Sequence, residues 1–484
     1  MGENKSSAAK LGVIGLACIV ISSMVGGGVF SLPQNMAAGA SAGAVLLAWL
    51  ITGVGMYFIA NTFSVLSRVK PDLTAGIYMY AREGFGPYVG FTIGWGYWLC
   101  QIFGNVGYAV ITMDALNYFF PPHFAGGNNL LSIVCGSVLI WGFNWVVLRG
   151  VKQAAILNVI GTIGKLVPLL LFCLILMFAF HCDKFDFNFW GKIAESGKSL
   201  GSLPAQLKST MLVTLWSFIG IEGAVVLSNR AKSQSAVSKA TLLGFLGCLV
   251  IYIGLSVLPF GFLTQEEIAA VANPSTAGVL EKVVGPWGAV FMNCGLLVAV
   301  LSSWLAWTMI TAEIPAAAAE NGTFPKAFAH QNENGAPSVS LWVTSALMQL
   351  AILMVYFSNN AWNTMLSITG VMVLPAYLAS TAYLWKLTED GEYQKIATKG
   401  RAAALFTSIL GTVYGLWLVY AAGVKYLFMA VIFLALGIPV FVWARRQNNP
   451  GQDVFTGREM ALAVLLVIFA LSAIYVFSHG HVSL

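Results

Sequence analysis

A single carboxylate interrupts one of the most apolar stretches of the chain. Glu222 lies within LVTLWSFIGIEGAVVLSNR, at residues 212–230, and Gly220 and Gly223 flank it. An ionisable group at mid-membrane depth is costly and usually faces a cavity or a partner. A lone buried carboxylate either pairs with a cation or takes a proton. The sequence therefore predicts a cationic ligand, a proton-transfer step, or both at Glu222.

Three consecutive glycines interrupt a second apolar run near the N-terminus. Gly26, Gly27 and Gly28 lie in VISSMVGGGVF. An unwound helix frees backbone N–H groups, and the N-terminus of a half-helix adds partial positive charge, so this site suits a substrate carboxylate. Close packing by small residues is the alternative. Two interrupted spans, one in each half of a chain, are typical of a transporter binding site.

A lysine and several aromatic residues also lie inside apolar runs. Lys165, in ILNVIGTIGKLVPLLLF, needs carbonyl oxygens or an acid if it is buried, unless it snorkels to a helix end. Tryptophan faces can bind guanidinium or ammonium groups, although many tryptophans simply form belts at span ends. The aromatic residues placed within spans are Tyr97, Trp98, Trp216, Trp304 and Trp307.

The elements that carry these residues are expected to be membrane-spanning helices. The chain has 484 residues, of which 58% are hydrophobic and 9% charged, with a mean hydropathy of +0.80. A soluble protein of this size needs far more charge, and continuous apolar runs argue against a β-barrel. Thirteen candidate spans lie near 11–36, 40–66, 86–118, 128–147, 154–181, 207–229, 240–263, 283–312, 339–358, 361–385, 402–421, 425–444 and 459–478.

The distribution of lysine and arginine predicts how the spans are oriented. With the N-terminus in the cytoplasm, most of the 25 basic residues fall in cytoplasmic segments, as the positive-inside rule requires. We therefore expect a multi-pass membrane protein with a cytoplasmic N-terminus. Thirteen spans place the C-terminus outside, whereas an interfacial last segment places it inside.

Cysteine and histidine patterns give no indication of a metal or cofactor. The seven cysteines occur singly, without a CxxC motif, which excludes a disulfide framework and a zinc site of familiar spacing. An intramembrane enzyme would need paired acids or an HExxH motif, and the sequence contains neither. We expect no enzymatic activity, no cofactor and no metal.

The interrupted spans and one loop resemble a known transporter family. The segments VISSMVGGGVFSLPQNMAAGA, YAREGFGP and LWSFIGIEGAVVLSNRA look like the amino acid–polyamine–organocation superfamily, within it the basic amino acid/polyamine antiporters of the arginine–ornithine and arginine–agmatine branch. This resemblance covers nearly the whole chain. It implies an all-α, leucine-transporter-type five-plus-five inverted-repeat fold with broken helices 1 and 6. Residues 1–181 and 182–385 would form the repeats, and 386–484 two or three further helices.

The resemblance also implies roles for individual residues. Glu222 would respond to protons, and the Lys165 ammonium would stand where sodium binds in other branches. Gly27 departs from the family, which has a small polar residue at that position. The implied substrate-binding residues are Ser23, Gly26, Gly27, Gly28, Tyr97, Cys100, Gln101, Asn105, Trp216, Ile219 and Trp307.

The function implied by the resemblance is exchange of external L-arginine for an internal cationic product, agmatine or ornithine, across a bacterial inner membrane. Exchange of lysine for cadaverine or of histidine for histamine is the alternative within antiporters, and proton-coupled import of a basic amino acid is a third. The expected partners are a small-molecule substrate and membrane lipid, not nucleic acid. The sequence leaves open whether two copies form a homodimer.

Overall fold

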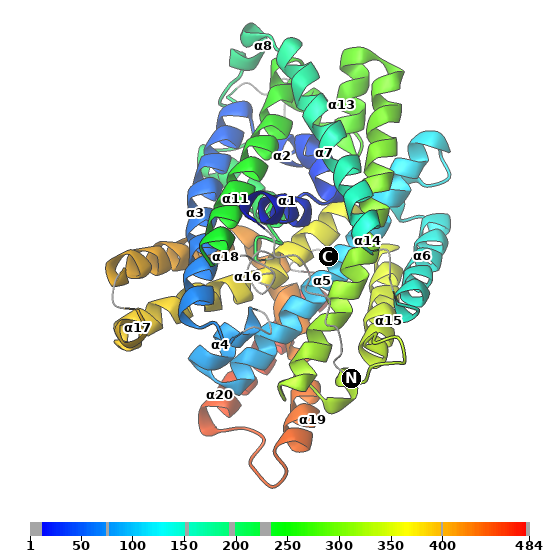
Figure 1. The fold of residues 1–484 in the computed structure, drawn as a ribbon. Helices are drawn as coiled ribbons and strands as arrows, with labels where there is room; N and C mark the ends of the chain where they lie inside the picture. The colour runs from blue at the N-terminus through cyan, green and yellow to red at the C-terminus, as the bar shows by residue number, and fades with distance from the viewer. Residues whose placement is uncertain are drawn as a thin grey trace.

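Helices make up most of the described chain, as Figure 1 shows. The computed structural model describes residues 12–73, 77–150, 154–192, 199–222, 234–397 and 400–480, so Gly223 and His481 lie outside it. In these ranges the only β-type pairing is an isolated bridge between Gln331 and Pro337. The expectation of an all-α membrane protein is confirmed.

Ten helices in the described ranges are long and apolar enough to cross a membrane. Because the runs of apolar residues are continuous, most boundaries agree with the sequence to within a few residues; 86–118, for example, is observed as Pro87–Phe119. The long helices are α3 (Ala42–Val69), α5 (Pro87–Phe119), α6 (Leu130–Leu148), α7 (Ala154–Phe178), α11 (Gln234–Val257), α14 (Pro286–Glu320), α15 (Ser338–Val355), α16 (Ala361–Glu389), α18 (Arg401–Ala435) and α20 (Gly457–Ser478).

The first predicted span is broken where the glycines lie. Helix α1 (Val13–Met24) ends before Val25, and the chain resumes as a 3₁₀ turn η1 (Gly27–Ser31) and a short helix α2 (Leu32–Ala37). Figure 1 places α1 near the centre of the molecule beside α11, which packs against it. The predicted interruption is therefore confirmed in the backbone.

The span that contains Glu222 is also interrupted. Helix α9 (Leu203–Ser217) ends five residues before Glu222, and residues 218–222 form turns. Gly220 adopts φ = +102°, a conformation that favours glycine. The described chain ends at Glu222, and the second half of this predicted span lies outside the described residues.

The segment after α16 contains a further break. Helix α18 covers the predicted span 402–421 and part of 425–444, and Gly423 inside it has the non-helical angles φ = 78° and ψ = 156°. Helix α19 (Ile438–Asn448) follows. Gly423 therefore separates the two segments at the position between the two predicted spans.

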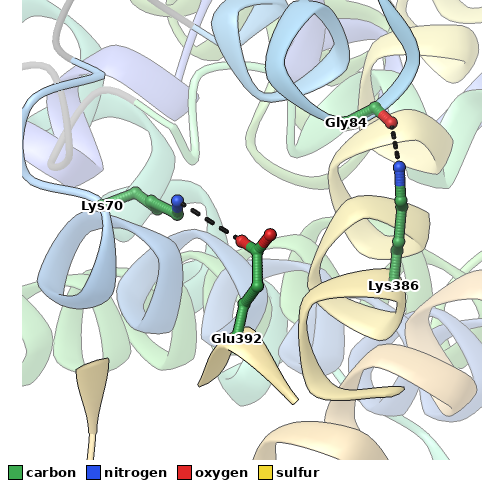
Figure 2. A network of polar contacts seen from close by, with 4 residues as sticks. All are labelled: Lys70, Gly84, Lys386 and Glu392. Carbon is green, nitrogen blue, oxygen red and sulfur yellow. Dashed lines mark hydrogen bonds and ion pairs between the residues drawn. The ribbon is translucent and has the colours of Figure 1, made fainter. Parts of the chain in front are cut away.

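Two lysines from distant segments make separate polar contacts near the end of α3 and the start of α5, which we call the basic end; Figure 2 shows these contacts from close by. The ammonium of Lys386 donates a hydrogen bond of 2.8 Å to the carbonyl of Gly84, in α4 (Tyr78–Phe85). Lys70, at the end of α3, lies 3.8 Å from the carboxylate of Glu392, in α17 (Glu392–Ile396). An exposed ion pair of this kind contributes little free energy. The ion pair is informative because it shows that segments expected on the same side of the membrane lie together.

Candidate functional site

Glu222 is buried and is held by hydrogen-bond donors from three segments. The hydroxyl of Tyr97, in α5, donates to Oε1 at 2.7 Å, and that of Tyr377, in α16, donates to Oε2 at 2.9 Å. The backbone N–H of Gly220 adds a third bond to Oε2 at 3.1 Å. Within the described ranges, no lysine or arginine forms an ion pair with Glu222. The carboxylate is thus solvated by neutral groups and retains capacity for a cation or a proton.

The two interrupted spans touch each other next to this carboxylate. The hydroxyl of Ser23, in α1, donates to the carbonyl of Gly220 at 3.1 Å and to that of Val20 at 2.8 Å. A Cβ atom on Gly220 would lie 2.9 Å from the Ser23 carbonyl oxygen. Glycine is therefore required at position 220 both for its positive φ and for the close approach of the two backbones.

The ring of Trp216, near the end of α9, lies directly on the backbone of η1. A Cβ atom on Gly28 would fall 1.7 Å from Cη2 of this ring, so no larger residue fits beneath it. Trp216 also meets Trp362, in α16, edge to face at a centroid distance of 5.6 Å. Trp216 therefore covers the broken first helix and is itself packed against Trp362.

Gly26 and Gly27 face different helices. A Cβ atom on Gly27 would lie 2.2 Å from Cγ2 of Val300, in α14, whereas one on Gly26 would lie 3.1 Å from the hydroxyl of Tyr108, in α5. Close packing, which the sequence left as an alternative, accounts for Gly27 and Gly28 in this conformation. Gly26 is the position where the broken backbone meets a polar neighbour.

Polar side chains of α5 connect this helix to α14 and α16. The thiol of Cys100 donates to the carbonyl of Thr369 at 3.3 Å. The amide of Asn105 donates to the Gln101 carbonyl at 2.8 Å and to Oγ1 of Thr311 at 3.0 Å. Residues predicted on the third span are therefore brought against two other helices.

Several buried polar atoms on these helices lack a hydrogen-bond partner within the described residues, and three of them belong to the residues just named. These three are Nε2 of Gln101, Oδ1 of Asn105 and Oγ1 of Thr369. An unsatisfied buried donor or acceptor costs about 1–3 kcal/mol, so such groups require an explanation. A small polar ligand lying between α5 and α16 would satisfy them.

Comparison with known proteins identifies the family. The amino acid permease family matches residues 11–471. The chain belongs to this amino acid permease family. Its sequence is 61% identical over 479 residues to a Chlamydia abortus protein named arginine/agmatine antiporter, covering 99% of each chain. Proteins of the same name from Chlamydia pneumoniae and Chlamydia trachomatis serovar L2 are 60% identical over 485 residues and 58% identical over 482 residues, covering at least 99% of each chain.

Other predicted site residues of this permease are less closely tied to Glu222. Ile219 is half-buried and donates its N–H to the Trp216 carbonyl at 3.1 Å. Trp307 is half-buried in α14, and its carbonyl accepts a 2.6 Å bond from Thr311, the partner of Asn105. Lys165 is 5% exposed on α7, which packs along α14. The predicted contact of Lys165 with carbonyls of the first helix stays a prediction.

Several residues of the permease site were not found from the sequence. Tyr377 lies in the apolar run VMVLPAYLAS, and nothing there marks its hydroxyl as a partner of Glu222. Thr369, Trp362 and Tyr108 are likewise single residues in helices. Their roles come from tertiary contacts, so only the unusual placement of polar and aromatic groups inside spans pointed toward them.

Proposed function

We propose that this permease exchanges external L-arginine for internal agmatine. The observation that carries the proposal is the buried Glu222 carboxylate at the junction of two interrupted helices, held by two phenol hydroxyls and free of any ion pair with a described lysine or arginine. Relatives near 60% identity that cover the whole chain are named for this pair of substrates. Lysine–cadaverine and histidine–histamine exchange receive no comparable support.

In this proposal, the broken first helix recognises one end of arginine and the aromatic residues recognise the other. The backbone of the broken first helix that follows Gly26 binds the substrate carboxylate, which agmatine lacks. Trp216 and Trp307 contact the guanidinium group by cation–π interaction. Gln101, Asn105 and Cys100 supply polar contacts along α5, and Ser23, Gly27, Gly28, Tyr97 and Ile219 complete the proposed site.

Glu222 and Lys165 provide the coupling in the proposed mechanism. Glu222 takes a proton or faces the cationic substrate, so its two phenol hydrogen bonds change with occupancy. The ammonium of Lys165 stands in for sodium, and transport needs no sodium. Ornithine is the alternative counter-substrate at this site.

The proposed setting is a bacterial cytoplasmic membrane, with the N-terminus and the basic end of Figure 2 facing the cytoplasm. Residues 1–181 and 182–385 form the two repeats, and 386–484 add the C-terminal helices. The mass of the purified protein in detergent distinguishes a single copy from a homodimer.

Counterflow in reconstituted vesicles tests the function. Purified protein is reconstituted with agmatine, ornithine, lysine, cadaverine, histamine or no substrate inside, and uptake of labelled arginine is measured. Uptake that requires internal agmatine supports obligate arginine–agmatine exchange. Equal uptake into empty vesicles driven by a proton gradient would instead identify an importer. Preference for internal cadaverine or histamine would overturn the choice of substrate.

A further inference from the structure

A polar cavity lies at the end of the bundle opposite the basic end. Helix α5 starts at Pro87, next to α4, and ends at Phe119, beside this cavity of about 620 Å³. The cavity is bounded by the end of α5, by α13 (Ser275–Val284) and by the first turns of α14 and α16. In the proposed orientation it opens toward the outside, and Figure 1 shows α13 running beside α14 at this end.

The ionisable side chains that line this cavity are acidic. Asp114 and Glu281 line it, and its lining contains no lysine or arginine among the described residues. Neither carboxylate forms an ion pair within the described ranges. Two unpaired carboxylates in one concave site attract a cation and concentrate it locally.

An independent feature points to a ligand in the same cavity. Asn293, which is 1% exposed, lines the cavity, and its Nδ2 donates to the Ala289 carbonyl at 3.0 Å. Its Oδ1 accepts no hydrogen bond within the described residues. Trp362, 3% exposed, also lines the cavity, and its Nε1 has no acceptor among the described residues. A buried amide oxygen left without a donor is what a guanidinium or ammonium group would satisfy.

The position of this cavity connects it to the central site. Trp362 is in edge-to-face contact with Trp216, which covers Gly28. Gln34, in α2, forms another part of the wall and accepts a 3.3 Å bond from Asn273. The cavity is therefore bounded by Trp362, which contacts Trp216, and by Gln34 of the outer half of the broken first helix.

We propose that the cavity lined by Asp114, Glu281 and Asn293 is a second, external binding site for the guanidinium group of the incoming substrate. This inference rests on the proposed arginine–agmatine exchange. The two carboxylates attract the cation, the Asn293 oxygen accepts one of its N–H groups, and the substrate waits there until the Trp216–Trp362 pair moves. Hydrogen bonds between a guanidinium group and a carboxylate are charge-assisted and roughly twice as strong as those between neutral groups.

The kinetic test uses the double variant Asp114→Asn/Glu281→Gln in right-side-out membrane vesicles. Electrostatic focusing raises capture rates by about tenfold or more, so we expect the KM for external arginine to rise about tenfold with kcat unchanged. The KM of the double variant should also depend less on salt, because the charges that salt screens in the wild type are absent. The control is Asp183→Asn/Asp186→Asn, which removes two exposed carboxylates of α8 (Cys182–Asp186), outside this cavity. A KM equal to that of the control overturns the proposal.

Equilibrium binding to the purified full chain separates this site from the exchange reaction. Labelled arginine and, in parallel, methylguanidinium are titrated onto the wild type and the double variant. We expect two saturable sites per wild-type chain and one in the double variant, with Asn293→Ala weakening only the second. One site in the wild type overturns the inference, even where exchange is intact. Two sites without exchange activity would overturn the proposed function and retain the cavity site. If Asp114→Asn does not fold, the single variant Glu281→Gln, in the short helix α13, replaces the double variant in both measurements.

Discussion

The hydroxyl of Tyr377 donates a hydrogen bond of 2.9 Å to Oε2 of Glu222, although 155 positions separate the two residues. Tyr97 makes the equivalent bond to Oε1 at 2.7 Å. One carboxylate therefore ties α5 and α16 to the turn that follows α9. Because phenols are neutral donors, these bonds can break when a cation or proton arrives without leaving a second charge buried.

Removal of the Tyr377 hydroxyl should impair exchange. Tyr377→Phe leaves Oε2 of Glu222 with only the Gly220 N–H, and a hydrogen bond to a charged group contributes about 1.5–3 kcal/mol. We expect arginine exchange in vesicles to fall by about tenfold or more. Tyr383→Phe is the matched control, because Tyr383 is buried on the same helix and its hydroxyl has no described partner. Equal activity of the two variants would show that the Tyr377 bond is only structural.

A methyl group on Gly28 should stop transport. Its Cβ atom would fall 1.7 Å from the Trp216 ring, so the ring must leave the broken helix or the helix must shift. We expect Gly28→Ala to insert in the membrane and to lose most arginine exchange. Gly142→Ala is the control, since a Cβ atom there meets nothing within 4 Å. Normal exchange by Gly28→Ala would mean that the Trp216–Gly28 contact plays no part in transport.

The sequence predicted most helices because hydropathy alone determines a membrane span. It predicted α14 as 283–312, but the helix extends to Glu320 because its last turns, TAEIPAAAAE, are helical without being strongly apolar. The span 207–229 was predicted to be interrupted beside Glu222, and α9 does end at Ser217, three residues before Gly220. Flanking glycines indicated an interruption but could not locate its first residue.

The site was predictable only where a residue is unusual for its surroundings. A carboxylate is unusual in an apolar run, so Glu222 could be identified from the sequence without knowledge of its partners. Tyr377 and Asn293 are ordinary in composition, and their importance depends on which helices meet. The sequence carries no local signal for such contacts, which arise from packing between segments far apart in the chain.

The two tryptophans proposed to contact the guanidinium group can be tested separately. A cation–π contact contributes about 1 kcal/mol, so Trp216→Leu and Trp307→Leu should each weaken apparent arginine affinity by about fivefold. Trp216→Leu should weaken the apparent arginine affinity more than Trp307→Leu, because Trp216 also packs on Gly28 and Trp362. Trp342→Leu, on an exposed face of α15, is the control. Unchanged affinity in both site variants would remove the cation–π contribution.

Lys165 should be required for transport, and sodium should not. Lys165 is 5% exposed on α7, and a buried cation in place of sodium makes the ion unnecessary. We expect wild-type exchange to be the same in sodium and in choline buffers. Lys165→Ala should reach the membrane with little activity. A sodium requirement in the wild type, or full activity of the alanine variant, would contradict this role.

The carboxylate of Glu222 should make exchange depend on pH. The described residues give it three hydrogen-bond donors and no cationic partner, so a proton and a cationic substrate compete for the same oxygens. Glu222→Gln keeps the shape of the side chain but loses both the charge and the titration. We expect it to fold, to flatten the pH profile of arginine exchange and to weaken binding of cationic substrates.

Two further variants sharpen this pH test. Glu222→Asp should retain some exchange with a displaced pH optimum, because the shorter side chain keeps a titrating group but alters its contacts with Tyr97 and Tyr377. Glu313→Gln, which removes an exposed acid of α14, should leave the profile of the wild type. The measurement is arginine exchange in vesicles across the pH range for all four proteins. Superimposable profiles for wild type and Glu222→Gln would make Glu222 a structural acid and place the proton step elsewhere.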